Sequence, residues 1–183
     1  MPKCSLQVLA VPMHASARII GIQNRLGEGS TVAYWLMKTE PEECSIDDLA
    51  AHPDRSVVWE GVRNYQARNF LRQMQAGDEV LVYHSSCKQI GVAGVARVSR
   101  AAYPDPAQFD TRSPYADPKS PPDKPRWDAV DVCFVRKFAR VLPLDELKAV
   151  PALEALPLVR RGNRLSVMPV SKAEWQAVLQ LGK

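Results

Sequence analysis

The residues WEGVRNYQARNF, from Trp59 to Phe70, carry more structural information than any other stretch of this chain. They place one tryptophan just before the start of a helix, then a polar turn, then an amphipathic helix that bears arginine. Asn64 is the predicted N-cap, because its side chain can accept hydrogen bonds from the first helical turn. Stacking of a base on an aromatic side chain contributes about 1–3 kcal/mol. The layout therefore indicates a binding site for a flat ring rather than a catalytic site.

Apolar periodicity predicts the elements on either side of this stretch. Residues 64–74 are expected to form a helix, because apolar side chains recur there at i, i+3, i+4 and i+7. Residues 33–38 (AYWLMK) are the predicted first strand, closed by Pro41. Ser45 followed by Asp48 predicts a short helix over 46–51.

Downstream, β-branched residues predict strands over 79–84 and 90–100, joined as an antiparallel hairpin. Gly91 and Gly94 in the second of these indicate a bulge or the close approach of another backbone, a curvature typical of barrels. Alternating apolar residues predict a long strand over 126–141.

The stretch from Pro104 to Pro125, named here the Pro-rich loop, holds seven prolines in 22 residues. That density excludes a helix or a central strand, so a long loop is expected. Short helical segments are predicted over 144–150 and 152–156. Ser171 and Glu174 form a capping box at the start of a C-terminal helix, with a hydrophobic staple of Val170 and Trp175.

Length and composition indicate one globular domain, since the 183 residues are 46% hydrophobic and 24% charged. The net charge of +4 permits nucleic-acid binding without requiring it. The four cysteines (Cys4, Cys44, Cys87 and Cys133) show no zinc-site or disulfide spacing, which fits a reducing, intracellular compartment. No apolar run approaches the length of a membrane span.

Residues 1–31 differ from the remainder, because their apolar pattern is irregular and Glu28 is their one acidic residue. A transit peptide has a similar composition. We expect instead a non-domain extension created by a mis-assigned start, with translation beginning at a GTG codon for Val32. That hypothesis implies a bacterial, cytoplasmic protein, and the alternative is a nuclear eukaryotic one.

Strands separated by short helices, without a repeated βαβ rhythm, predict an α+β fold. The expected architecture is a small mixed β-barrel flanked by short helices, and not a doubly wound sheet. Residues 32–183 form the expected single domain.

Six blocks together resemble the EVE domain, a member of the PUA-like superfamily of barrels that is similar in architecture to YTH domains. The blocks are AYWLMKTEP, WEGVRNYQARNFL, GDEVLVYHSS, YPDP with SPYADPKS, RWDAVDVCFVRKF and RRGNRLSVMPVS. The resemblance spans residues 33–181 and implies non-enzymatic recognition of a modified nucleobase, flipped or unpaired, such as a modified cytosine. The carrier is DNA or RNA.

The resemblance and the residue chemistry together give a candidate set. The expected base-binding residues are Lys38, Thr39, Trp59, Val62, Arg63, Asn64, Tyr83, His84, Ser85, Ser86, Leu165 and Ser166. The expected phosphate-binding residues are Arg68, Arg72, Arg160, Arg161 and Arg164. Trp59 also has a plain interpretation as a core residue, Asn64 as a simple cap, and the arginines as a solvated face. Arg68 and Arg72, at i and i+4, repel each other unless an anion lies between them.

His84 suggests a catalytic base, but no motif pairs it with an orienting group or a nucleophile, so a hydrogen-bonding role is expected. Neither a metal nor another cofactor is expected, because the histidines are scattered.

The alternative function is a nucleic-acid-modifying enzyme, with Glu60 and His84 as an acid and base pair, or an accessory subunit of a modification-dependent nuclease. A third interpretation makes the Pro-rich loop a protein-interaction segment, although a lid over the pocket is the simpler role. A monomer that contacts no membrane is expected.

Overall fold

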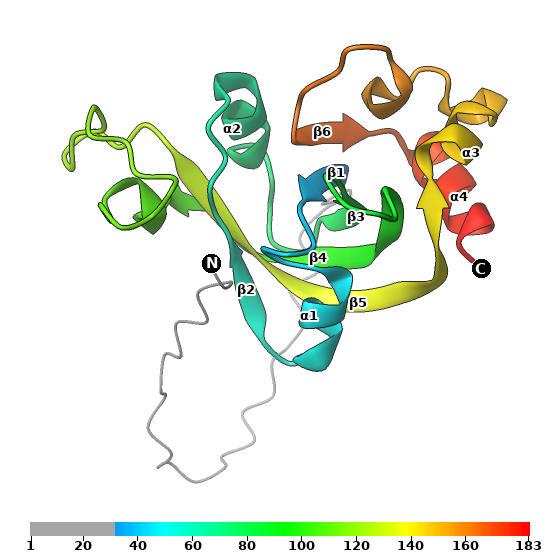
Figure 1. The fold of residues 1–183 in the computed structure, drawn as a ribbon, viewed down its shortest axis with the longest axis horizontal. Coiled ribbons are helices and arrows are strands. Elements are labelled where there is room, and N and C mark those ends of the chain that lie inside the picture. The colour runs from blue at the N-terminus through cyan, green and yellow to red at the C-terminus, as the bar shows by residue number, and fades with distance from the viewer. Residues whose placement is uncertain (1–31) are drawn as a thin grey trace, which may run out of the picture.

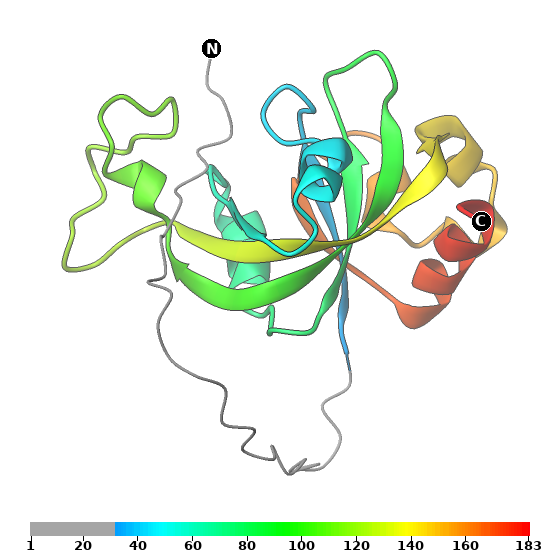
Figure 2. The same cartoon turned by 90° about the horizontal axis from the view of Figure 1, so that it is seen from below.

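The computed structural model describes residues 32–183, and the hypothesis about residues 1–31 lies outside this part of the chain. A mixed six-stranded sheet forms its centre, and short helices cover both faces (Figures 1 and 2). The strands are β1 (Tyr34–Thr39), β2 (Ser56–Trp59), β3 (Glu79–His84), β4 (Gly91–Pro104), β5 (Asp128–Pro143) and β6 (Val167–Val170). The helices are α1 (Ile46–Ala51), α2 (Tyr65–Leu71), α3 (Leu144–Lys148) and α4 (Lys172–Leu181), with 3-10 turns η1 (Pro106–Gln108), η2 (Pro151–Leu153) and η3 (Pro157–Val159).

The strand order is β2-β5-β4-β3-β1-β6, in which β1 and β3 run parallel and every other neighbouring pair runs antiparallel. This arrangement confirms an α+β fold with a mixed sheet. The expected closed barrel is not confirmed, because β2 and β6 each pair with one neighbour and not with each other in the described residues. Both of these edge strands are only four residues long. Figure 2 shows the strong twist of the long β4 and β5 ribbon, which bends the open sheet.

Alternation along the central strands divides the core between the two faces of the sheet. Trp35 and Met37 of β1 pack in a cluster with residues of α1 and α2, whereas Leu36 packs in a second cluster with residues of α3 and α4. This is the period of two that a strand buried on both faces requires. The helices thus hold the sheet from both sides and fix the positions of its strand ends.

The local signals of the sequence are largely confirmed. Both capping boxes form, from Ser45 with Asp48 and from Ser171 with Glu174. The β3 and β4 hairpin is antiparallel, and a Cβ at Gly94 would lie 2.5 Å from the carbonyl oxygen of Arg136, which confirms the close approach. The ends of the longer elements differ from expectation: α2 stops at Leu71, β4 continues to Pro104, and β5 spans 128–143. The sequence did not predict β2, β6, η1 or η3, and η1 lies within the Pro-rich loop, where only loop was expected.

Within residues 32–183 no helix has the length and apolar character needed to cross a membrane. The same residues contain no group of three or more His, Cys, Asp or Glu side chains placed to hold a metal ion.

Candidate functional site

An open cavity of about 810 Å³ lies where β1 and β2 end, and we name it the strand-end cavity. Its walls come from the end of β1 and the turn after it, the end of β2 and the turn after it, and the Pro-rich loop. The lining residues of these segments are Lys38, Thr39, Glu40, Glu43, Cys44, residues 58–62, Pro106, Ala107, Asp110 and residues 112–115, with Ser85, Arg164 and Ser166. The volume falls within the range of small-molecule sites, about 300–1,000 Å³. The cavity is therefore large enough for one planar heterocycle.

Backbone hydrogen bonds bring these strand ends together. The Lys38 N–H donates to the Ser166 carbonyl at 2.7 Å, and the Ser85 N–H donates to the Thr39 carbonyl at 2.8 Å. The Thr39 hydroxyl donates to the Cys44 carbonyl at 2.9 Å, which closes the turn after β1. The wall on this side is thus held by backbone hydrogen bonds and by the Thr39 hydroxyl.

Trp59 belongs to both the core and the cavity. The residue is 7% exposed and packs in the cluster with α1 and α2, and it also lines the strand-end cavity. The core interpretation holds for most of the indole, and only its remaining surface is available to a ligand. Tyr115 of the Pro-rich loop supplies a second aromatic side chain to the wall.

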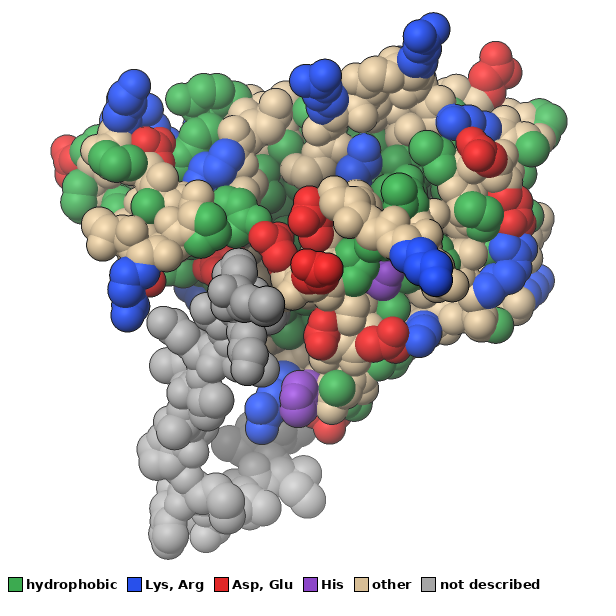
Figure 3. Space-filling model, in the orientation of Figure 1, with side chains coloured by type: hydrophobic (Ala, Val, Ile, Leu, Met, Phe, Trp, Pro, Cys, Tyr) green, Lys and Arg blue, Asp and Glu red, His purple; other side chains and the backbone are tan. Residues whose placement is uncertain are grey.

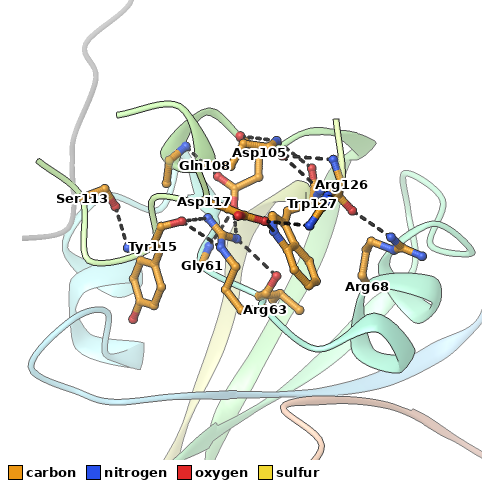
Figure 4. Close-up of polar contacts among 12 residues, drawn as sticks. Gly61, Arg63, Arg68, Asp105, Gln108, Ser113, Tyr115, Asp117, Arg126 and Trp127 are labelled. Atoms are coloured by element: carbon orange, nitrogen blue, oxygen red, sulfur yellow. Dashed lines mark hydrogen bonds and ion pairs between the residues drawn. The ribbon is translucent and has the colours of Figure 1, made fainter. Parts of the chain in front are cut away.

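Hydrogen bonds of the Arg63 side chain, named here the Arg63 clasp, join the Pro-rich loop to the turn after β2 (Figure 4). The Nε and Nη2 atoms of Arg63 donate to the Tyr115 carbonyl, and Nη1 donates to the Asp105 carboxylate at 2.6 Å and to the Val62 carbonyl at 3.2 Å. The guanidinium also lies over the rings of Tyr115 and Trp127. Four of its five N–H groups are engaged in this way, so Arg63 organises the loop.

Asp105 is the fully buried partner in this clasp. One of its carboxylate oxygens accepts hydrogen bonds from Arg63 and from the Gly61 N–H at 3.0 Å, and the other accepts from the Ala107 N–H at 2.7 Å. Gly61 has a φ of +82°, and a Cβ there would lie 2.8 Å from the Tyr115 ring. A residue without a side chain is needed where the loop crosses the turn.

Buried Gln108 anchors the same loop from within. Its amide donates to the carbonyls of Asp105 and Trp127 and accepts from the hydroxyl of Ser120 at 2.5 Å. The Trp127 indole N–H donates to Asp117 at 2.8 Å. The Pro-rich loop is consequently an ordered wall of the cavity.

Tyr115 also reaches across the cavity. Its hydroxyl donates to the Glu43 carboxylate at 2.5 Å, which joins the Pro-rich loop to the turn after β1. Burial, and next the hydrogen bond to Glu43, raise the pKa of the Tyr115 phenol. The phenol therefore stays protonated and remains a donor at neutral pH.

The cavity contains charges of both signs. Lys38 and Glu60 are half-buried, and burial is the main cause that lowers the pKa of Lys38 and raises that of Glu60. The Asp105 carboxylate raises the pKa of Glu60 further. Figure 3 shows acidic side chains gathered near the centre of one face of the molecule, with lysine and arginine spaced around them.

Seven of the residues expected at the site line the strand-end cavity: Lys38, Thr39, Trp59, Val62, Ser85, Arg164 and Ser166. The other expected base-binding residues are not among its lining residues, namely Arg63, Asn64, Tyr83, His84, Ser86 and Leu165. Asn64 is the N-cap of α2, as predicted, and accepts from the N–H groups of Gln66 and Ala67. Arg63 contributes to the site through the clasp.

His84 is buried and has a structural partner. Its Nε2 accepts a hydrogen bond from the Ile46 N–H at 3.1 Å, at the start of α1. Burial lowers the pKa of His84, so the neutral imidazole is favoured. The hydrogen bond of His84 is thus a structural one to the backbone of α1, and no hydrogen bond joins His84 to Glu60 in the described part of the chain.

The arginines of α2 have protein partners. Arg72 forms an ion pair with Asp128 at 2.6 Å, so a carboxylate supplies the anion that the i, i+4 arginine pair was expected to take from phosphate. Arg68 donates to the Arg126 carbonyl at 2.9 Å and lies over the exposed ring of Tyr65 at 4.8 Å. Arg160 and Arg161 are exposed, and Arg160 lines a separate hollow of about 480 Å³ beside α3.

Sequence reasoning did not single out several residues of the cavity wall, among them Glu43, Gly61, Asp105 and Tyr115. Tyr115 lies in the SPYADPKS block and Gly61 in the WEGVRNYQARNFL block, so both lie in segments that resemble the EVE domain. Their roles depend on contacts between segments 42–72 residues apart, which no local pattern reveals.

A mixed sheet whose strand ends and ordered loop surround an open cavity is an arrangement suited to binding a small planar ligand. Residues 33–181 match the model of the EVE domain, and the chain belongs to this family.

Curated relatives include thymocyte nuclear protein 1 of Mus musculus, 45% identical over 165 residues, which cover 81% of this chain and 73% of that protein. The Homo sapiens protein of the same name is 44% identical over 166 residues, with the same coverage. A crystal structure of a Pseudomonas putida protein is 55% identical, with a TM-score of 0.80, over 82% of this chain and all of the other. The human THYN1 protein has been crystallised in complex with 5-methylcytosine-containing DNA; it is 44% identical, with a TM-score of 0.75, over 82% of this chain and 98% of that chain.

Proposed function

We propose that this protein is a non-enzymatic reader of modified DNA that binds 5-methylcytosine, flipped or unpaired, in the strand-end cavity. The observation that carries the proposal is the open cavity of about 810 Å³ between Trp59, Tyr115 and the ends of β1 and β2. The human relative crystallised with 5-methylcytosine-containing DNA supports the choice of ligand.

The chemistry of the wall supports this choice of ligand as well. A methyl group adds little volume, so discrimination requires an apolar surface for the mark and hydrogen bonds that fix the ring. Trp59, Val62 and Tyr115 supply apolar and aromatic surface, while Lys38 and Glu60 supply a donor and an acceptor. One cavity thus holds both kinds of group.

Basic residues near the cavity would contact the nucleic-acid backbone. Arg112 and Arg164 are exposed and line the cavity, and Arg160 and Arg161 lie four and three residues before Arg164. Phosphate contacts fix the position of a protein on DNA without reading its sequence. We assign these arginines to positioning, and the base recognition to the cavity.

The enzymatic alternative lacks its catalytic pair. Glu60 lines the cavity, but His84 does not, and its Nε2 is occupied by the Ile46 N–H. A general base must reach the proton that it removes. Binding without turnover is therefore the function that we propose, in a monomer whose cytoplasmic location stays a prediction.

The test compares DNA duplex probes with one central 5-methylcytosine or one unmodified cytosine, by fluorescence anisotropy at several salt concentrations. We expect tighter binding of the methylated probe, with affinity for both probes falling as salt rises. Equal affinity for the two probes at every salt concentration contradicts the proposal, and so does release or conversion of the base in a mass-spectrometric assay.

The same probes made as RNA and as single strands identify the carrier. Because Trp59 is also a core residue, Trp59→Phe is the informative variant, and its folding is checked by thermal unfolding. A folded Trp59→Phe protein should lose part of its preference for the methylated probe, whereas Trp175→Phe in the second core cluster should keep it.

A further inference from the structure

Two charged side chains in the strand-end cavity form no ion pair in the described part of the chain. Lys38 and Glu60 are half-buried, and neither side chain makes a hydrogen bond or an ion pair within residues 32–183. The Lys38 ammonium instead lies 5.8 Å from the centre of the Tyr83 ring. Partial burial of a charge without a partner is unfavourable, because the group loses part of its hydration.

The other carboxylates of the cavity differ in this respect. Glu43 accepts from the Tyr115 hydroxyl at 2.5 Å, and Asp110 pairs with Arg112 at 3.1 Å. Glu40 is exposed to solvent. Glu60 is therefore the one acid of the cavity wall that is both partly desolvated and open to a ligand.

A carboxylate only accepts hydrogen bonds and an ammonium only donates them. 5-Methylcytosine and thymine carry the same methyl group and differ at C4, where cytosine has an amino donor and thymine a carbonyl acceptor. A pocket that reads the methyl group alone cannot separate these two bases. A carboxylate beside C4 favours the amino group and repels the carbonyl.

We propose that Glu60 is the specificity-determining residue that accepts a hydrogen bond from the 4-amino group of the bound base, while Lys38 donates to a ring acceptor. The inference rests on the proposed function and adds to it the selection of cytosine over thymine. It gives each of these two side chains a hydrogen-bonding partner, an amino donor for Glu60 and a ring acceptor for Lys38.

The environment of Glu60 supports this role. Burial and the Asp105 and Asp110 carboxylates raise the pKa of Glu60, against the opposing effect of the Arg63 guanidinium. A base that donates to Glu60 stabilises its ionised form, so occupation of the cavity relieves the cost of keeping the carboxylate charged.

The experiment places 5-methylcytosine, cytosine or thymine opposite an abasic site in one DNA duplex, so that pairing strength does not differ between the probes. The wild-type protein should bind 5-methylcytosine about tenfold more tightly than thymine, within the range for a hydrogen-bonded base contact. In Glu60→Gln the ratio should fall below about twofold, because an amide can also donate to a carbonyl.

Glu42→Gln is the matched control, since Glu42 is an exposed acid of the turn after β1 that does not line the cavity. It removes the same charge and should keep the tenfold ratio, even if both probes bind more tightly. A Glu60→Gln protein that keeps the wild-type ratio, with an unchanged thermal midpoint, overturns the inference.

A ligand lacking the group tests the same contact in the unaltered protein. A probe with 5-methylpyrimidin-2-one, which has no 4-amino group, should bind the wild type about tenfold more weakly than 5-methylcytosine. Equal binding of these two probes overturns the inference. If the wild type prefers 5-methylcytosine to cytosine but not to thymine, the proposed role of Glu60 is refuted and the proposed function stands. If it does not prefer 5-methylcytosine to cytosine, the proposed function itself fails.

Discussion

Replacement of Gly61 by alanine tests how the Pro-rich loop is held against the turn after β2. Gly61 has a φ of +82°, where a residue with a side chain costs about 1–2 kcal/mol. The new Cβ would also lie 2.8–2.9 Å from three carbons of the Tyr115 ring, and overpacking of this kind costs about 1–3 kcal/mol. The expected loss in free energy of unfolding is the sum of the two, about 2–5 kcal/mol.

Gly162→Ala is a matched control, because Gly162 has a φ of +80° and a Cβ added there would meet nothing within 4 Å. Urea unfolding of this variant should show only the backbone cost of about 1–2 kcal/mol. In a Tyr115→Ala background, Gly61→Ala should likewise show only that cost, so a double-mutant cycle should give a coupling of about 1–3 kcal/mol. Equal losses for the two glycine variants and no coupling to Tyr115 would refute this account of the loop.

Three further predictions concern other residues. Gln108→Ala leaves buried polar groups of the Pro-rich loop unsatisfied, so it should cost about 1–3 kcal/mol and speed proteolysis within the loop, measured by urea unfolding and limited trypsin digestion. Burial lowers the pKa of His84 below 6.5, so the unfolded chain binds more protons there and stability should fall as pH drops through about 6.5 toward the folded-state pKa. Thermal unfolding against pH checks this, and a His84→Gln protein with an unchanged pH slope speaks against it. Arg164→Ala should weaken binding to methylated and unmethylated DNA alike and flatten the salt dependence, and an unchanged salt slope contradicts a phosphate contact.

The sequence predicts best those features that depend on near neighbours. The N-caps of α1 at Ser45 and α2 at Asn64 and the capping box of Ser171 and Glu174 form as expected, because these hydrogen bonds join residues two or three positions apart. The central strands follow from their apolar runs. β2 and β6 escaped prediction because each has only four residues and is defined by pairing with a distant strand, β5 or β1.

The residues of the site also fall into those that the sequence predicted and those whose roles depend on tertiary contacts. Lys38, Trp59 and Ser166 were expected because they lie in blocks that resemble the EVE domain, and all three line the cavity. The direction of the Arg63 side chain could not be predicted, since its partners Asp105 and Tyr115 lie 42 and 52 residues further along the chain. Arg72 was expected to bind phosphate because its ion pair with Asp128 is a tertiary contact, which a local sequence pattern does not reveal.

The central claim is that the strand-end cavity receives the methylated base, and a crystal structure of the protein with DNA containing one 5-methylcytosine tests it most directly. We predict that the base is rotated out of the helix and lies in the cavity, in contact with Trp59 and within hydrogen-bonding distance of Glu60. A 5-methylcytosine that stays stacked in the duplex, or that binds elsewhere with the cavity empty, contradicts the claim.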